Sequence, residues 1–288
     1  MPELPEVETL KRELNKKLTG KKIVAVKLIY AKTIKCPSPQ KFQIRVKNIQ
    51  IKFVARRAKV LIIELENNES LLVHLKMTGQ LIYAPLTGSL TVGGHPQISG
   101  TSNLPNKYTR LVFTFSDQTK LHFNDLRKFG WFKLVTNEEK IKLLSHLGIE
   151  PLSPKFSLAN FTEILNRYPK RKLKQLLLDQ TLIAGLGNIY VDEACFLARV
   201  LPTRITGTIT KNEVRKLHQA ITAVLKLSIK HKGTSAKNYV RSDGQAGGFV
   251  PHLNVYGRSK LPCKKCRRPI SKIKLSGRGT HFCEHCQH

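Results

Sequence analysis

The sequence predicts an α+β protein of several domains, with a leading helix and an antiparallel β-sandwich followed by a helical region and a metal-binding hairpin. Three observations predict this fold class. Apolar residues near the start recur at helical spacing, short β-rich runs separated by turn residues fill residues 22–135, and two cysteine pairs lie near the C-terminus. A closed barrel fits the β-rich region as well as a sandwich does.

The composition points to a polyanionic partner. The chain has 288 residues, and 50 Lys and Arg against 19 Asp and Glu give a net charge of +31. Such an excess attracts polyanions and makes binding sensitive to salt. Ribosomal and membrane-surface proteins share this charge, but here the basic residues alternate with core-forming segments. No run of 18 apolar residues and no secretory signal is visible, so a cytoplasmic protein without a membrane span is expected.

The first helix is predicted from an apolar stripe of Leu4, Val7, Leu10, Leu14 and Leu18, with Gly20 after its end. Before it stands Met1-Pro2. A methionine followed by proline is normally removed, which would leave Pro2 as a secondary amine with a pKa of about 7.7–8.0.

Such an amine is a nucleophile near neutral pH and can form an iminium with an aldehyde-type carbon. Glu3 lies next to it, and Glu6 lies one helical turn further on. Taken alone, this hexapeptide is better explained as an ordinary helix start.

The β-rich region is predicted from alternating runs bounded by turn residues. These runs are KIVAVKLIY, IQIKFVARR, KVLIIELEN, SLLVHLKM, TRLVFTFSD, TKLHFND and WFKLV. Residues 84–107 are rich in Gly and Pro and are expected to form a long loop.

The middle of the chain is expected to be helical. Thr136 with Glu139, and Thr210 with Glu213, have the spacing of capping boxes. Between them, KRKLKQLLLDQ predicts a basic amphipathic helix, and Asn188 is expected to cap another helix that ends near Ala198. Residues 234–257 are predicted to form a loop.

The C-terminal cysteines carry the strongest local signal. Their spacing is that of a tetrahedral structural zinc site, in the order Cys263, Cys266, Cys283, Cys286. A redox pair is the weaker alternative. The residues around them are basic, which indicates a phosphate-contacting hairpin. The remaining two, Cys36 and Cys195, are expected to be buried or free thiols.

Two further stretches are ambiguous on the residues alone. Lys59 has the position of an exposed turn lysine. In the stretch 124–131, Arg127 and Phe129 are either a surface cation and a core ring, or an exposed pair that could enter a base stack. The turn Gly185-Leu186-Gly187 could hold an anion, but it lacks the spacing of a dinucleotide site.

Together these motifs resemble the bacterial formamidopyrimidine-DNA glycosylase family, the Fpg/Nei group. The motifs occur in order along nearly the whole chain as PELPEVET, RRAK, HLKMTG, DLRKFG, LGIEPLS, LLLDQ, GLGNIYVDE, SDGQAG, NVYGR and the zinc cysteines. The opening, HLKMTG and DLRKFG are similar to the formamidopyrimidine branch rather than to the endonuclease VIII-like branch.

The resemblance implies a bifunctional DNA glycosylase and AP lyase acting on oxidised purines in duplex DNA. Pro2 would form the Schiff base, Glu3 would be the general acid, and Glu6 would support them. Lys59 and Arg278 would serve strand cleavage. The expected DNA contacts are Met77, Tyr108, Arg127, Phe129, Lys174, Asn188 and Tyr190, with Glu193 in the same motif as the last three.

The resemblance also implies the arrangement of the domains. Residues 1–135 would form the catalytic sandwich, 136–250 a helix-two-turns-helix DNA-binding domain, and 251–288 a zinc finger. One structural zinc is the expected cofactor, and the expected state is a monomer at the nucleoid.

Two positions depart from the family pattern. Tyr108 stands where the family often has a DNA-contacting histidine, and Lys237-Asn238 alters the lesion loop. A phenol can donate a hydrogen bond but cannot become cationic. Two alternatives stay open: the same chemistry on oxidised pyrimidines, and a zinc-containing DNA-binding protein without catalysis.

Overall fold

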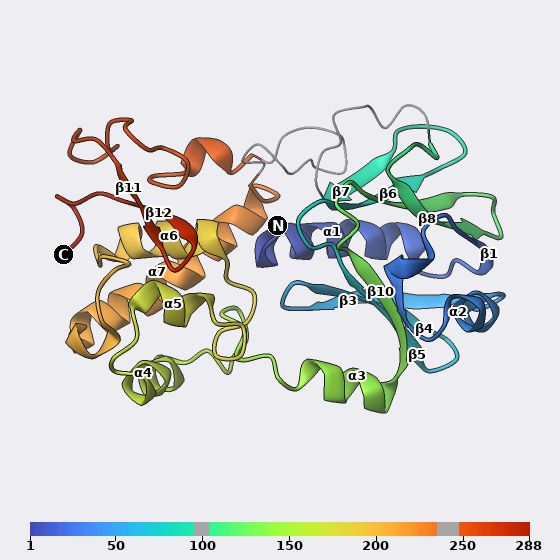
Figure 1. Cartoon of the computed structure of the whole chain (residues 1–288), viewed down its shortest axis with the longest axis horizontal. Helices are drawn as coiled ribbons and strands as arrows, with labels where there is room; N and C mark the ends of the chain where they lie inside the picture. Colours follow the sequence, from blue (N-terminus) through green and yellow to red (C-terminus); the bar gives the residue numbers. More distant parts are fainter. Residues whose placement is uncertain (95–103, 235–247) are drawn as a thin grey trace. The chain divides into compact units, whose positions relative to one another are not determined.

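The computed structural model describes residues 1–94, 104–234 and 248–288. The chain divides into two compact units. The first comprises Met1–Ser145 with Lys232–Gly248, and the second comprises His146–His231 with Phe249–His288. Figure 1 labels most of the elements of both units. The predicted division into three domains after residues 135 and 250 stays a prediction.

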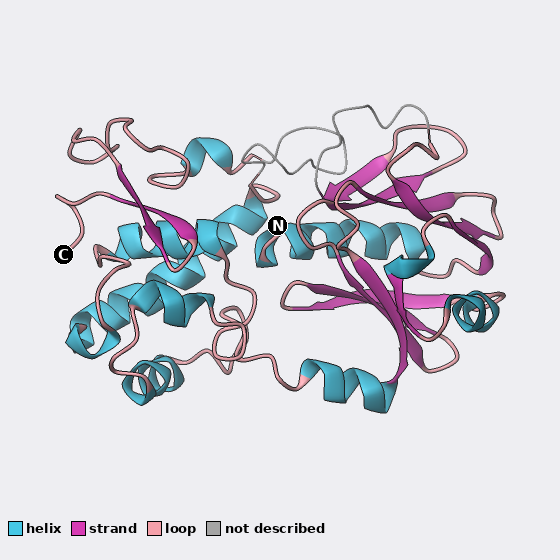
Figure 2. Ribbon diagram, in the orientation of Figure 1, coloured by secondary structure: helices cyan, strands magenta, loops and turns pink. Residues whose placement is uncertain are grey.

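The first unit is a β-sandwich, as predicted. One five-stranded sheet has the order β1-β8-β9-β6-β7 and the other has the order β2-β10-β5-β4-β3 (Figure 2). The strands of the first sheet are β1 (Ile23–Leu28), β6 (Gly79–Ala84), β7 (Thr91–Gly94), β8 (Thr109–Phe115) and β9 (Lys120–Asp125). Those of the second are β2 (Ile34–Cys36), β3 (Ile51–Arg57), β4 (Val60–Leu65), β5 (Glu69–His74) and β10 (Trp131–Thr136).

Helix α1 (Leu4–Leu18) belongs to the core of this sandwich. Its apolar stripe from Val7 to Leu18 joins one buried cluster with side chains of both sheets, among them Leu61, Val73, Phe113, Phe123 and Phe132. The helix approaches β7 closely, because a Cβ at Gly93 would overlap the Leu10 side chain. This packing fixes the start of α1, where the candidate chemistry lies.

The structure confirms each predicted strand run and adds elements that were not predicted. Residues 84–107 were expected to form a loop, but they contain β7, which pairs with β6. The short strand β2, the strand β6 and the helices α2 (Pro39–Val46) and η1 (Ala31–Thr33) were also missed. Strand β2 pairs with β10 in parallel, so the second sheet is not wholly antiparallel.

The second unit is helical and ends in a β-hairpin. Its helices are α4 (Leu158–Arg167), α5 (Leu173–Leu178), α6 (Asn188–Ala198) and α7 (Lys211–Lys230), with the short η2 (Thr206–Thr208) and η3 (Val250–His252). Strands β11 (Ser271–Leu275) and β12 (Arg278–Phe282) form the hairpin. Phe196 of α6 packs against Val255, Ile270 and two of the cysteines, which attaches the hairpin to the helices.

Both predicted capping boxes are present, at α7 and at α3 (Asn137–Leu144), which belongs to the first unit. The prediction that Asn188 caps α6 is wrong, because Gly187 is the N-cap and Asn188 is the first helical residue. The predicted loop 234–257 contains η3, and its residues 235–247, including Lys237 and Asn238, lie outside the described residues. Within the described ranges no helix is long and apolar enough to cross a bilayer.

Candidate active site and nucleic-acid interface

The start of α1 gathers the residues expected to carry chemistry. Pro2, Glu3 and Glu6 are all buried, whereas Met1 is exposed. Glu3 is the N-cap of the helix, and its N–H donates to Glu6 Oε2 at 2.8 Å in a capping box. Carboxylates are favoured here because the N-terminal end of a helix carries a partial positive charge.

A distant segment of the same unit completes this site. The Thr234 N–H donates to the other oxygen of Glu6, Oε1, at 2.8 Å. Gly233 has a φ of +85° and would bring a Cβ to 3.1 Å from Glu6 Cγ and Oε1, so glycine suits the close approach. The Glu6 carboxylate therefore joins the helix start to the segment that follows α7.

Lys59 lies in the turn between β3 and β4, but it is not the exposed turn lysine that its position in the sequence suggested. Its exposed fraction is 7%. The preceding Ala58 has a φ of 52°, which turns the backbone sharply. Arg56, on the same hairpin, donates through Nε to Glu8 Oε2 of α1 at 2.8 Å and ties this turn to the first helix.

His74 was quoted within HLKMTG but was given no role. The Lys76 N–H donates to its Nδ1 at 2.9 Å, and its ring lies against Trp131 with centroids 5.7 Å apart. Burial and the positive charges of Lys76, Lys59 and the chain's amino terminus lower the pKa of His74 to about 3. The imidazole is therefore neutral at physiological pH and lies in a cationic environment.

Two loops present exposed apolar and cationic side chains. Met77 stands in the turn between β5 and β6, while Arg127 and Phe129 stand in the loop between β9 and β10. Phe129 is 52% exposed, and the Arg127 guanidinium lies over its ring at 4.7 Å from the ring centroid. This geometry agrees with the exposed-pair alternative and excludes a core role for Phe129. Tyr108 is half-buried, just before β8.

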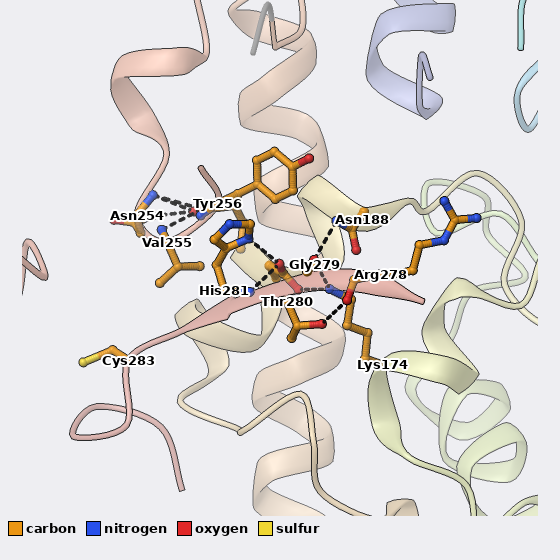
Figure 3. A network of polar contacts seen from close by, with 12 residues as sticks. Lys174, Asn188, Asn254, Val255, Tyr256, Arg278, Gly279, Thr280, His281 and Cys283 are labelled. Atoms are coloured by element: carbon orange, nitrogen blue, oxygen red, sulfur yellow. Dashed lines mark hydrogen bonds and ion pairs between the residues drawn. The ribbon is translucent and has the colours of Figure 1, made fainter. Parts of the chain in front are cut away.

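In the second unit the predicted phosphate ligand Lys174 is a buried residue. Its exposed fraction is 1%, and its Nζ lies 2.6 Å from Asp192 Oδ1. It also donates to the Gly279 carbonyl oxygen at 3.2 Å, while the His281 N–H donates to Asp192 Oδ2 at 2.9 Å (Figure 3). An ammonium group has three N–H donors, and these two contacts of Lys174 use two of them.

Asn188 and Tyr190 occupy different surroundings. Asn188 Nδ2 donates to the same Gly279 carbonyl at 2.9 Å, and its buried Oδ1 has no hydrogen-bond partner among the described residues. The Tyr190 ring is wholly buried, and its hydroxyl lies 2.6 Å from Ser228 Oγ. Asn188 thus lies beside the hairpin, whereas Tyr190 belongs to the helical core.

Asp192 and Glu193 are buried acids of α6 that the sequence reasoning either missed or left without a partner. Glu193 is buried and its carboxylate accepts from the backbone N–H groups of Asn254, Val255 and Tyr256 at 2.8–3.0 Å. A signal was present in the sequence, because two acids in the otherwise apolar segment NIYVDEACFLA need partners if the helix is buried.

Arg278 is exposed at the start of β12 and borders a cavity of about 350 Å³ between α5 and the hairpin. The cavity is lined by three basic residues, two neutral polar residues, one carboxylate and two leucines, namely Arg171, Lys174, Arg278, Gln175, Ser276, Asp179, Leu178 and Leu275. Gln175 donates to Ser276 and Arg171 pairs with Asp179. This surface can receive an anion such as a phosphodiester.

The four C-terminal cysteines converge as predicted. Their sulfur atoms all lie within 4.8 Å of one another, with Cys263 to Cys286 at 4.0 Å and Cys266 to Cys283 at 3.5 Å. Tetrahedral thiolates about 2.3 Å from a Zn²⁺ are roughly 3.8 Å apart, so the residues fit the ion. All four positions are protein ligands, and one zinc here is structural.

Comparison with known families covers most of the chain. Residues 1–132 match the formamidopyrimidine-DNA glycosylase N-terminal domain, 147–240 match the formamidopyrimidine-DNA glycosylase H2TH domain, and 260–288 match a zinc finger found in FPG and IleRS. A formamidopyrimidine-DNA glycosylase of Herpetosiphon aurantiacus is 40% identical over 288 residues, covering all of each chain. That of Halalkalibacterium halodurans is 41% identical over 290 residues, with the same full coverage.

Solved structures give the same result. A complex of a Lactococcus lactis FPG mutant with DNA containing Fapy-dG has a TM-score of 0.87 at 35% identity, and each chain is covered completely. A complex of the Lactococcus lactis Fpg with DNA containing an abasic site has a TM-score of 0.87 at 34% identity, with 99% of each chain covered. On the sequence, the fold, the cysteine cluster and these similarities, the chain belongs to the formamidopyrimidine-DNA glycosylase family of DNA repair enzymes.

Proposed function

We propose that this chain is a bifunctional DNA glycosylase and AP lyase that removes oxidised purines, such as 8-oxoguanine and formamidopyrimidines, from duplex DNA. The observation that carries the proposal is the buried start of α1, where Pro2 is followed by two buried carboxylates. A helix cap alone gives no reason to bury Glu6 and to bring Thr234 against it.

Removal of Met1 makes Pro2 the nucleophile. The secondary amine attacks C1′ of the damaged nucleotide and the bond from C1′ to the base breaks. The base leaves with the electron pair of that bond and takes up the proton that the amine nitrogen loses. Glu3 acts as general acid by protonating the sugar ring oxygen, so the ring opens and an iminium joins Pro2 to C1′. Glu6 holds Glu3 in place through the capping box.

Strand cleavage follows from the iminium. The iminium makes the proton on C2′ acidic. Loss of this proton expels the 3′ phosphate in a β-elimination, and a second, δ-elimination expels the 5′ phosphate. Lys59 and Arg278 are assigned to these steps as a proton donor and a phosphate ligand. The neutral His74 beside Lys59 suits a hydrogen bond to a phosphate oxygen without adding charge.

The damaged nucleotide must leave the base stack before its C1′ is accessible. Met77, Arg127 and Phe129 are assigned to the space that it vacates, with Arg127 facing the orphaned base, and Tyr108 to the adjacent backbone. The exposure of Phe129 and the guanidinium over its ring support this assignment.

In the second unit, Asn188 and Arg278 are assigned to phosphates. Lys174 supports them from the interior, because it donates to the same Gly279 carbonyl as Asn188, next to Arg278. Tyr190 supports them through the hydrogen bond of its hydroxyl with Ser228, which anchors the helix that carries Asn188. The zinc holds the hairpin that carries Arg278. We assign the chemistry to residues 1–135, DNA binding to 136–250 and the zinc finger to 251–288, and propose a cytoplasmic, nucleoid-associated monomer.

Oxidised pyrimidines are the second candidate substrate. A specific observation favours them, because a structure similar to this chain is the Lactococcus lactis FPG in complex with DNA containing an oxidised pyrimidine. Cleavage rates on 8-oxoguanine and thymine-glycol duplexes separate the two, and much faster cleavage of thymine glycol would contradict the preference for purines.

The test of the mechanism is borohydride trapping on lesion-containing duplex DNA. We expect a covalent adduct with the processed chain, whose intact mass shows the loss of Met1, and none with a chain that carries an N-terminal extension. Pro2→Gly keeps a free amine and should retain part of the trapping. Absence of an adduct with the processed chain would favour a DNA-binding protein without catalysis.

A further inference from the structure

Asp125, the last residue of β9, is an aspartate to which nothing above assigns a role. Its exposed fraction is 0%. Oδ2 accepts from the Gly130 N–H at 2.6 Å, while Oδ1 accepts from the Thr78 hydroxyl and from the Arg127 N–H at 3.2 Å. Each oxygen is therefore occupied by groups of the protein, and the carboxylate is not available to a substrate.

The partners of this carboxylate lie on two different loops. Thr78 follows Met77 in the turn between β5 and β6, whereas Arg127 and Gly130 enclose Phe129 in the loop between β9 and β10. The Thr78 hydroxyl also accepts from the Arg127 N–H at 2.9 Å. Asp125 and Thr78 thus form a polar bridge between the loops that carry the exposed residues.

The position of these loops in the fold makes the bridge significant. Strand β5 belongs to one sheet and β6 to the other, and the same is true of β10 and β9. Each loop is therefore a crossover between sheets. Strand pairing joins the two crossovers at both of their ends, through Gly79 with Asp125 in one sheet and through His74 with Trp131 in the other. Between these ends, the Asp125 carboxylate and the Thr78 hydroxyl connect the two loops through their side chains.

The backbone of Asp125 extends the same arrangement. Its N–H donates to the Tyr108 carbonyl at 2.9 Å, and its carbonyl accepts from Arg110 Nε at 2.9 Å. Gly130 fits tightly, because a Cβ there would lie 2.5 Å from Phe123 Cζ and 3.1 Å from Asp125 Oδ2. The segment before β8 that carries Tyr108 is thereby attached to the same residue.

We propose that Asp125 is a positioning residue that couples the Met77 turn to the Arg127–Phe129 loop, so that the three side chains enter the duplex as one rigid body. A carboxylate suits this role, since hydrogen bonds to a charged acceptor are stronger than neutral ones and a buried charge cannot easily lose them. The inference rests on the proposed function and adds to it the residue that governs extrusion of the nucleotide.

The test compares a substrate that needs extrusion with one that does not. The first is a duplex with 8-oxoguanine opposite cytosine, and the second is a single strand with an abasic site. For Asp125→Asn we expect cleavage of the duplex to fall about tenfold or more, while borohydride trapping on the single strand stays within about twofold. An asparagine keeps the size but places an N–H₂ against at least one of the donors.

Two further variants keep the test decisive if Asp125→Asn is poorly folded. Thr78→Val removes the bridging hydroxyl at little change in volume and should reproduce the selective loss, and Thr78→Ser should restore duplex cleavage. Asp117→Asn is the matched control. It also removes an aspartate that accepts from a turn N–H, that of Thr119, but its turn between β8 and β9 carries none of the proposed DNA contacts.

The outcomes separate this inference from the proposed function. Equal loss on both substrates, or no loss in Asp125→Asn and Thr78→Val, would overturn the positioning role while leaving the glycosylase intact. Failure of the unaltered chain to trap on either substrate would instead contradict the proposed function. Loss of duplex cleavage without loss of single-strand trapping in Asp125→Asn and in Thr78→Val, with Thr78→Ser and Asp117→Asn unaffected, supports the inference.

Discussion

The pair of Lys174 and Asp192 predicts a large loss of stability from a single substitution, Asp192→Asn. Each partner is almost completely buried, and their charged atoms lie 2.6 Å apart. Breaking a buried pair by removing one charge costs about 3–5 kcal/mol, because the other charge stays buried without compensation.

The measurement is the free energy of unfolding from urea titration of the zinc-loaded protein. We expect Asp192→Asn to lower it by about 3–5 kcal/mol and to speed the release of zinc to a chelator, because Asp192 also accepts from the His281 N–H of the hairpin. The matched control is the double variant Lys174→Met with Asp192→Leu. It removes both charges and should recover at least half of the loss.

Two results would refute this reasoning. A loss below about 1 kcal/mol in Asp192→Asn would mean that Lys174 finds water or another acceptor. A double variant no more stable than Asp192→Asn would mean that packing, rather than the unpaired charge, determines the cost.

Three further predictions follow from residues described above. The pKa of His74 is lowered to about 3, so below about pH 6.5 the unfolded chain binds a proton at His74 that the folded chain does not bind. The free energy of unfolding therefore falls by up to about 1.4 kcal/mol for each pH unit of acidification in this range. His74→Gln removes this titration and should flatten the profile of unfolding free energy between about pH 4 and 6. Removal of the zinc by a chelator should lower the melting temperature and abolish binding to lesion DNA, and a chelated protein that still binds tightly would contradict a structural zinc. Glu193→Gln replaces one carboxylate oxygen by a donor facing backbone N–H groups, and should cost about 1–3 kcal/mol by urea titration, whereas Glu163→Gln, in an exposed pair, should cost less than about 0.5 kcal/mol.

Local patterns in the sequence were sufficient for much of the fold. The stripe from Leu4 to Leu18, the capping boxes and the alternating strand runs depend on neighbours within a few residues, and each was recovered. The cysteine spacing likewise fixes a tetrahedral site with little help from the rest of the chain. Strand β7 was missed because Gly93 and Gly94 favour a loop locally. Its pairing with β6 and its contact with Leu10 are the compensating interactions, and these are distant in sequence.

The candidate site was less predictable because its side chains depend on distant partners. Lys174 has the appearance of a surface lysine in a basic helix, and only Asp192 and the carbonyl of Gly279 explain its burial. Asp125 stood in a quoted motif without a role, since its hydroxyl partner Thr78 is 47 residues away. The resemblance to a family indicated which residues to expect in the site, whereas the contacts that hold each side chain in place are visible only in the structure.

The hydrogen bond between Glu6 and Thr234 has a consequence for the synthesis of the chain. Its partners are separated by 228 residues, and the segment Lys232–Gly248 belongs to the first unit although nearly all of that unit precedes it. A nascent chain that has emerged only as far as Ser145 contains Pro2, Glu3 and Glu6 but lacks this donor. The end of the protein that is made first is thus completed by a segment that is made late, and the ribosome releases no finished active site until the helical region has been translated.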